Sequence, residues 1–266
     1  MKLHTTLPLL LCTASVSFAT TIASFDGGAD TPWTAGGNVP ANIPAIASGQ
    51  GVGGSDAMQL AYAGIGGNTT TLGFNLADPG AQMSVPFSFQ FRVNAPISPS
   101  ADGFSFSLMP TSAVGTSGLV PYLGEDPGMA GTVAFGFDTW GNGGVDLPFG
   151  PGGNTDYNDV SIWFNGTQYG VIDPRTLGVT LDNDTWHTAT GNVNLVTGAA
   201  SIALDGISML NVVLPGIAPY EYRVGFGART GGENENVYLD NLIIPEPASI
   251  SLAGLGLLIL GRRRRK

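Results

Sequence analysis

The chain has 266 residues, of which 11% are charged, 43% are hydrophobic and 40 are glycine. This composition excludes a disordered chain and is typical of an extracellular β-rich protein with many turns. Residues 20–244 contain four arginines, no lysine and 19 of the 20 acidic side chains, a net charge of about −15. Such a charge excludes nucleic acid and anionic membrane as partners of this segment; it favours cations and fits simple solubility equally well.

Residues 1–19 have the features of a secretory signal peptide. Lys2 supplies the positive end, residues 7–12 supply the apolar centre, and Ser-Phe-Ala at 17–19 supplies the small-residue cleavage site. The apolar run is too short to span a membrane permanently. We therefore expect secretion across the inner membrane and a mature chain that begins at residue 20.

Cysteine and histidine are nearly absent from the expected mature chain. The only cysteine, Cys12, lies in the leader, so the mature chain has neither a disulfide nor thiol chemistry. His187 is the only histidine after the leader. This scarcity excludes a multi-histidine zinc site and leaves little for a Ser-His-Asp triad.

Strand patterns dominate the body of the chain. Loops and one or two strands are expected in the Gly/Pro/Asn-rich stretch 20–67. Beyond it, apolar residues occupy alternate positions in several runs, which is the period of a half-buried strand. These strands are predicted at 85–93, 104–108, 133–137, 160–164 and 220–226. Glycine-rich turns separate the runs and no stretch shows a helical period, so the fold class is an all-β sandwich or jelly roll.

The loop after the strand at 133–137 carries side chains with oxygen donors. Asp138 stands at the strand end, and Asn142 and Asp146 follow four and eight residues later. A loop that folds back on the strand end would gather these oxygens with a backbone carbonyl, as calcium requires. The alternative is a solvated turn, since Asp, Asn and Gly are ordinary turn residues. An EF-hand is disfavoured because aromatic residues occupy two ligand positions and no helices flank the loop.

The composition changes at Pro245. Pro-Glu-Pro at 245–247 precedes an apolar run at 248–260 and a basic cluster at 262–266. The run is short and contains glycine, which favours transient membrane association over a permanent transmembrane helix. The three parts resemble the PEP-CTERM sorting signal of Gram-negative bacteria, over 245–266. The resemblance implies processing by an exosortase-type enzyme and a location in the cell envelope, at the surface or in the extracellular polysaccharide matrix.

The body of the chain resembles the L-type (legume-like) lectin family. Four segments carry the resemblance in family order: 84–108, 132–142, 159–166 and 222–244. They correspond to the strands around the family's Ala-Asp-Gly motif (here 101–103), the metal-loop strand, the strand after that loop and the closing strands. The resemblance implies a concanavalin A-like jelly roll over 20–244. It also implies a secreted, calcium-dependent protein that binds carbohydrate or exopolysaccharide and is not an enzyme.

The family resemblance assigns sugar-binding roles. Asp102 would accept hydrogen bonds from two sugar hydroxyls, after a cis Ala101–Asp102 peptide bond. Asn142 would donate to the same sugar, and the Trp140 ring would cover its apolar face. Gly118, in Ser-Gly-Leu at 117–119, is the best candidate for the glycine loop whose backbone amide contacts the sugar.

The resemblance also assigns metal-binding roles. Calcium would be held by Asp138, the Trp140 carbonyl, Asn142 and Asp146. The family's transition-metal site uses a Glu and a His, and here these positions are Gly136 and Asp159. Without them a transition-metal site is not expected. We expect calcium alone, with Asp159 as a possible additional ligand.

Two other functions are compatible with the sequence. A structural surface or matrix protein would keep the sandwich without sugar binding, as the changes at Gly136 and Asp159 suggest. A jelly-roll glycoside hydrolase needs two carboxylates about 5 to 10 Å apart on one face, and its usual Glu-x-Asp-x-x-Glu strand is missing. The glutamates available in the body are Glu125, Glu221, Glu233 and Glu235.

Overall fold

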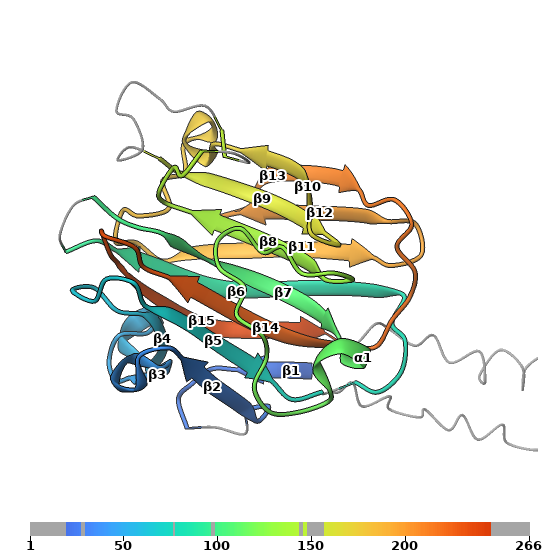
Figure 1. The fold of residues 1–266 in the computed structure, drawn as a ribbon, viewed down its shortest axis with the longest axis horizontal. Coiled ribbons are helices and arrows are strands. Elements are labelled where there is room, and N and C mark those ends of the chain that lie inside the picture. Colours follow the sequence, from blue (N-terminus) through green and yellow to red (C-terminus); the bar gives the residue numbers. More distant parts are fainter. Residues whose placement is uncertain are drawn as a thin grey trace, which may run out of the picture.

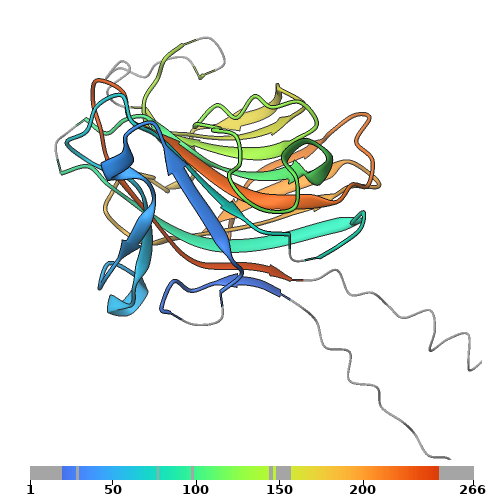
Figure 2. The same ribbon diagram turned by 60° about the horizontal axis from the view of Figure 1, so that its bottom comes forward.

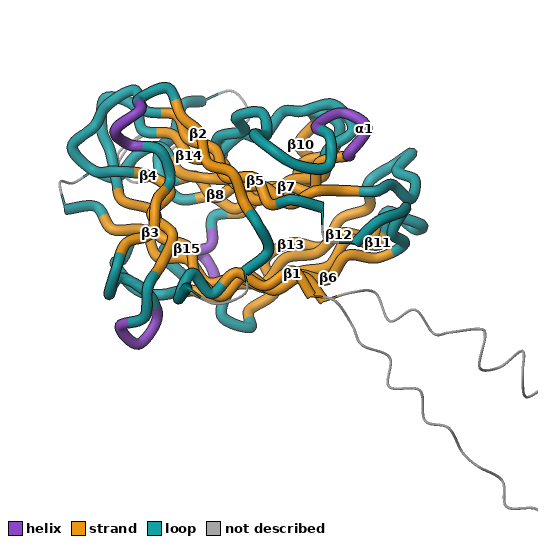
Figure 3. The backbone as a smooth tube through the Cα atoms, turned by 90° about the horizontal axis from the view of Figure 1, so that it is seen from below, coloured by secondary structure: helices purple, strands orange, loops and turns teal. Residues whose placement is uncertain are grey.

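The protein is described here by a computed structural model, over residues 20–27, 30–76, 78–96, 99–143, 146–147 and 157–245. Two antiparallel sheets face one another as the layers of a sandwich (Figures 1 and 3). The all-β sandwich predicted from the sequence is therefore confirmed. The predicted signal peptide and nearly all of the predicted sorting tail lie outside the described residues.

Sheet A has eight strands in the order β13-β12-β11-β6-β15-β4-β3, and β1 also pairs with β15. The strands are β1 (Thr20–Ala23), β3 (Ala45–Ala47), β4 (Ala57–Ala61), β6 (Ser84–Asn94), β11 (His187–Asn194), β12 (Ala199–Leu204), β13 (Ile207–Val213) and β15 (Asn236–Pro245). Because Thr20 is the register partner of Pro245, the two ends of the described domain lie side by side (Figure 2).

Sheet B has seven strands in the order β10-β9-β8-β7-β14-β5-β2. They are β2 (Trp33–Gly37), β5 (Thr69–Phe74), β7 (Gly103–Pro110), β8 (Val133–Asp138), β9 (Asp159–Phe164), β10 (Thr167–Ile172) and β14 (Tyr222–Arg229). The helical turns are α1 (Thr111–Val114) and three 3-10 turns, Pro40–Asn42, Val52–Gly54 and Pro174–Leu177. Within the described residues, no helix has the length and apolar character needed to cross a bilayer.

The predicted strands agree closely with the observed ones. The runs at 85–93, 104–108, 133–137 and 160–164 are β6, β7, β8 and β9. The last run begins two residues later than predicted, because Tyr220 forms only an isolated bridge with Gln82 before β14 starts at Tyr222. Residues 20–67 contain four strands, more than the one or two expected. These strands are short and lie toward one side of the sandwich, where alternation is a weak signal.

Phenylalanine side chains fill the space between the two sheets. Phe89 of β6 packs against Phe106 and Phe226 of sheet B, with ring centroids 5.2 Å apart in both pairs. Phe104 and Phe137 stack at 4.5 Å across β7 and β8. Burying such aromatic rings supplies most of the driving force for joining the sheets. The fully buried phenylalanines are Phe74, Phe89, Phe91, Phe104, Phe106, Phe135 and Phe137.

The outer face of sheet B is covered by its own chain. After α1, residues 115–127, here called the strap, run back across this face (Figure 1). A Cβ on Gly227 would lie 1.9 Å from the Leu123 carbonyl oxygen, and one on Gly136 would lie 2.1 Å from that of Glu125. Glycine is therefore required beneath the strap, and the strands there are buried on both faces.

Hydrogen bonds fix the strap at both ends of its path. The buried Arg223 guanidinium donates to carbonyl oxygens of Val114, Ser117 and Gly118, at 3.1, 3.1 and 2.6 Å. Further along, the Ser105 hydroxyl donates to the Leu123 carbonyl at 2.9 Å. These contacts set the path of the strap. As a result, Glu125 and Asp126 lie at the end of sheet B where β8 ends.

We expect Gly227→Ala to destabilise the domain by about 1–3 kcal/mol, because the new methyl group must push the strap off the sheet. Gly232→Ala is the matched control, since its Cβ meets nothing within 4 Å. The control should change the unfolding free energy by less than about 0.5 kcal/mol. Urea denaturation of the two variants checks this, and equal midpoints would show that the strap does not depend on the glycine.

Candidate functional site

Strand register gathers several charged residues at one end of sheet B. Asp138 at the end of β8 is paired with Gly103 of β7 on one side and with Asp159 of β9 on the other. Arg229, at the end of β14, is paired with the same Gly103. Asp102 directly precedes Gly103. Residues that are far apart in the sequence therefore meet at one edge.

Three carboxylates form a cluster at this edge. One oxygen from each of Asp126, Asp138 and Asp146 lies within 4.8 Å of the others. Asp138 comes from the strand end, Asp146 from the loop after it, and Asp126 from the strap. The predicted pair of Asp138 and Asp146 is thus brought together, with Asp126 as a third member that the sequence did not indicate.

Hydrogen bonds hold the loop while leaving carboxylate oxygens open. The Trp140 amide donates to Oδ1 of Asp138 at 2.7 Å, and the amides of Asn142 and Gly143 donate to Oδ2 of Asp146. Oδ2 of Asp138 and Oδ1 of Asp146 are buried and have no hydrogen-bond partner among the described residues. Unpaired buried oxygens in a set of hard donors fit a cation such as calcium.

Burial and mutual repulsion raise the pKa values of these carboxyls. Burial is the main cause for Asp138, whose pKa lies well above its usual value, and Asp159 and Glu125 raise it further. Burial, with repulsion from Asp146, raises the pKa of Asp126 to about 6. A bound cation would remove the repulsion and favour the ionised forms.

Asp159 lies beside the cluster and is held in another way. Its Oδ2 accepts a hydrogen bond from the Tyr157 hydroxyl at 2.6 Å, and that hydroxyl in turn accepts one from the Leu147 amide at 2.6 Å. Burial raises the pKa of Asp159 to about 7, although the Tyr157 hydroxyl lowers it. Asp159 therefore braces the far side of the loop through Tyr157 and Leu147.

Asp102 is buried and forms an ion pair. The Ala101–Asp102 peptide bond is cis, as the lectin resemblance implied. The Asp102 amide donates to the Arg229 carbonyl, and the Thr139 amide donates to the Asp102 carbonyl at 3.0 Å. Arg229 Nε lies 3.2 Å from Oδ2 of Asp102, and its Nη2 contacts Oε1 of the buried Glu125. Asp102 is thus tied both to the strand end and to the loop after Asp138.

Asp102, Trp140 and Asn142 line a single open pocket of about 460 Å³. Arg229 and the glycine-rich turn that follows β14 also line this pocket. A Cβ on Gly231 would lie 2.9 Å from Oδ2 of Asp102, so glycine allows this turn to approach the carboxylate. The pocket offers an acceptor, an aromatic ring and an amide on one concave surface.

Gly118 is not brought to this pocket. Its carbonyl accepts from Arg223 Nη2, and Arg223 lies at the opposite end of β14 from Arg229. In its place, Gly124 of the strap lines a second hollow beside the pocket, together with Glu125 and Asp126. Glu221 also lies at the far end, bonded to Thr111 and to the Gly80 amide.

Sequence reasoning missed the contributions of Glu125, Asp126 and Arg229. The sequence marks these residues only by composition. Charged side chains are rare in this chain, and Glu125 and Asp126 form an adjacent acidic pair between Gly and Pro. The strap that carries the pair has no periodicity to predict its path. Its position at the site follows from packing on the outer face of sheet B.

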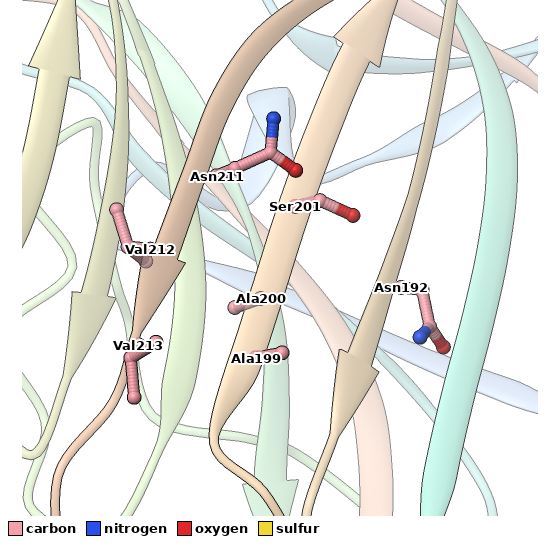
Figure 4. A pocket seen from close by; sticks show the side chains of 7 residues that line it. All are labelled: Asn192, Ala199, Ala200, Ser201, Asn211, Val212 and Val213. Carbon is pink, nitrogen blue, oxygen red and sulfur yellow. The ribbon is translucent and has the colours of Figure 1, made fainter.

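A separate hollow lies on sheet A, across β11, β12 and β13 (Figure 4). Its lining is neutral throughout, with only short polar groups among alanines and valines. It lacks the charge and the aromatic ring of the pocket at the end of sheet B. The lining residues are Asn192, Ala199, Ala200, Ser201, Asn211, Val212 and Val213.

Solved structures with the same fold are lectins. A Bauhinia forficata lectin in complex with GalNAc is 17% identical, with a TM-score of 0.60, over 87% of this chain and 99% of that one. Peanut lectin is 15% identical, with a TM-score of 0.62, over 87% and 98%. The VIP36 exoplasmic/lumenal domain, in a Ca²⁺/Man-bound form, is 14% identical, with a TM-score of 0.60, over 86% and 90%.

The sequence itself matches little outside the tail. No curated protein is detectably similar to the chain. The family model of the PEP-CTERM protein-sorting motif matches residues 244–266, which confirms the predicted sorting signal. The described domain therefore has the jelly-roll fold of the legume lectins, and the chain carries a PEP-CTERM sorting motif at residues 244–266.

Proposed function

We propose that this protein is a secreted, calcium-dependent carbohydrate-binding protein that catalyses no reaction. The observation that carries the proposal is that Asp102, Trp140 and Asn142 share one pocket beside the carboxylate cluster. These are the three side chains that the lectin resemblance predicted to contact sugar. A small concave pocket with a few convergent polar groups and one aromatic ring suits a monosaccharide unit.

Calcium would be held by Asp126, Asp138 and Asp146, together with the Trp140 carbonyl and Asn142. Support comes from the unpaired oxygens of Asp138 and Asp146 and from the donor set, which contains oxygen alone. When bound, the ion supplies positive charge that offsets carboxylate repulsion. The loop amides already bonded to Asp138 and Asp146 would then fix Trp140 and Asn142 against the pocket.

Each pocket residue would contact a different part of the sugar. Asp102 would accept hydrogen bonds from hydroxyls. Burial raises the pKa of Asp102, and Arg229 beside it offsets part of this rise by favouring the ionised carboxylate. The half-buried Trp140 would cover an apolar sugar face. The Asn142 side chain would donate or accept at the rim. Glu221 lies at the opposite end of the sheet, which argues against a pair of catalytic glutamates that includes it.

A structural surface protein without sugar binding is the second candidate. The ion pair between Asp102 and Arg229 favours it, because Arg229 already occupies part of the acceptor surface. In that case the cluster would bind calcium only to stabilise the loop.

The ends of the chain would determine its location. We infer that residues 1–19 direct secretion and that 245–266 are recognised by an exosortase-type enzyme after transient membrane association. The domain at 20–244 would then reside in the envelope, at the surface or in the polysaccharide matrix of a Gram-negative bacterium. The two ends of the described domain, Thr20 and Pro245, are register partners in β1 and β15.

We expect Asp126→Asn to weaken calcium binding by at least about tenfold, or 1.4 kcal/mol, because it removes one of three clustered charges. Calorimetric titration of calcium into chelator-treated protein measures this. Asp184→Asn, an exposed aspartate paired with Arg92, is the matched control and should bind as the parent does. If the calcium affinity of Asp126→Asn is unchanged, the strap does not contribute a ligand to the metal site.

We expect the metal-free protein to lose stability as pH rises from about 5 to 7.5. The pKa values of Glu125, Asp126 and Asp159 are raised to about 7, 6 and 7 in the folded state, from 4.5, 3.8 and 3.8. The folded state therefore binds more protons than the unfolded chain in this window, so deprotonation costs stability. Thermal melts with chelator should show a lower Tm at pH 7.5 than at pH 5, and calcium should raise the Tm most at pH 7.5. A metal-free Tm that rises with pH would contradict the electrostatics of the cluster.

We expect glycan binding to require calcium and the Asp102 carboxylate. Labelled protein applied to a glycan array in calcium should bind, and binding should disappear with EDTA and in Asp102→Asn, whose calcium affinity should be unchanged. Glu221→Gln, at the far end of the sheet, should bind as the parent does. Tight calcium binding with no glycan bound would establish the structural protein instead.

A further inference from the structure

One end of sheet A carries exposed apolar side chains. Among the described residues, four large hydrophobic side chains are at least 60% exposed, and three of them, Met83, Val196 and Val213, lie at this end. The amide of Leu195, next to Val196, donates to the Met83 carbonyl at 2.8 Å. On the other side of the same turn, Ala199 is the register partner of Val213. The three exposed side chains therefore belong to one surface, here called the apolar end.

The apolar end also lacks charge. The turns and strands that form it are residues 79–88, 189–204, 206–220 and 241–245. None of these ranges contains Asp, Glu, Lys, Arg or His, although the chain has 20 acidic side chains. Glu221 stands at the border, with its carboxylate bonded to the Gly80 amide and the Thr111 hydroxyl. Val213 also lines the neutral hollow on sheet A (Figure 4). A contiguous apolar surface without charge is typical of a contact with a partner or a membrane.

The chain leaves the described domain at the same end. β15 runs antiparallel to β6, so Pro245 lies beyond Ile243, the register partner of Ser88 in the first half of β6. Thr20 pairs with Pro245. Figure 1 shows the end of β15 on the side where β11 and β13 also end. Beyond Pro245 the sequence continues into the apolar run at 248–260, which we expect to associate with a membrane. The apolar end is therefore next to the segment that reaches the membrane.

We propose that the apolar end of the domain rests on the lipid surface of a membrane while the C-terminal segment is associated with it. The partner is a neutral, zwitterionic bilayer surface, because the net negative charge of the domain repels anionic lipid. A single weak membrane segment gives marginal binding, and a second apolar contact on the same chain adds to it. The contact fixes the orientation of the domain as well as its distance from the membrane.

This orientation directs the Asp102 pocket away from the membrane. Glu235, the residue before β15, accepts a hydrogen bond from the Thr139 hydroxyl at 2.8 Å, so β15 begins beside the loop that follows Asp138. The strand ends at Pro245, and its ten residues span about 30 Å. The pocket and the apolar end therefore lie at opposite ends of the domain. The membrane contact does not depend on the proposed sugar binding.

Site-specific fluorescence quenching tests the orientation. Cys12 is the only cysteine of the chain, so Cys12→Ser allows a single label to be placed on the full chain. Val196→Cys places it at the apolar end. Asp184→Cys is the matched control, because Asp184 is exposed and its amide donates to the Val93 carbonyl near the opposite end of β6. On phosphatidylcholine vesicles with doxyl-labelled lipid, we expect at least about threefold quenching of the Val196 label, protection of it from aqueous iodide, and neither effect at Asp184. Replacing phosphatidylcholine by phosphatidylglycerol should reduce the quenching.

A triple substitution tests the apolar side chains themselves. Met83→Ser, Val196→Ser and Val213→Ser together should lower the partition of the full chain into phosphatidylcholine vesicles by at least about tenfold, because less apolar surface is buried. Leu119→Ser, which changes the fourth highly exposed side chain but lies on the strap, should change the partition by less than about twofold. The triple variant should keep the Tm and the calcium affinity of the parent, because the substituted side chains are exposed and far from the carboxylate cluster.

Three outcomes would overturn the proposal. If vesicles leave the Val196 label as open to iodide as the Asp184 label, the domain does not rest on the membrane. If the label is protected without vesicles, and only at high protein concentration, the apolar end is an interface between copies of the chain. If it is protected without vesicles at every concentration, the C-terminal segment of the same chain covers it. None of these outcomes concerns calcium or glycan binding, so the proposed function is tested separately.

Discussion

The close packing of the strap on glycine is the constraint on which the site depends. Gly136 and Gly227 leave room for backbone carbonyls of the strap directly on the outer face of sheet B. This contact carries Glu125 and Asp126 to the strand ends where Asp138 lies. The Glu125 carbonyl fills the space that a side chain at Gly136 would need.

Electrostatics connects the carboxylate cluster with the pocket. The charge of the body is strongly negative, and at the site several buried carboxyls stand around one arginine. Arg229 bridges Asp102 and Glu125, so it links the strap to the pocket wall. Buried acids at this density are stable only when protonated, paired or bound to a cation. The raised pKa values and the unpaired oxygens are two consequences of the same crowding.

The local parts of this arrangement were predictable. Alternating phenylalanines identified β6, β7 and β8, because each side chain of a strand takes a fixed side of the sheet. Asp138 and Asp146 are close in sequence and belong to one loop, so their meeting follows from a short turn. Asp126 and Arg229 could not be found in this way, because their contacts with the site cross strands and loops that no local pattern relates. Gly118 was misplaced for the same reason, since the path of the strap cannot be inferred from its spacing.

By itself, the sequence determined that the chain is an all-β sandwich with a loop of oxygen donors and a sorting tail, because strand period, turn residues and terminal signals are local properties. Its resemblance to lectins identified Asp102 as a candidate sugar-binding residue and predicted the cis peptide bond before it. Only the tertiary structure decided that the strap lies over sheet B, that Arg229 pairs with Asp102, and that two hollows share a rim. The physical reason is that register and close packing bring distant residues together, and these are set by all strands at once.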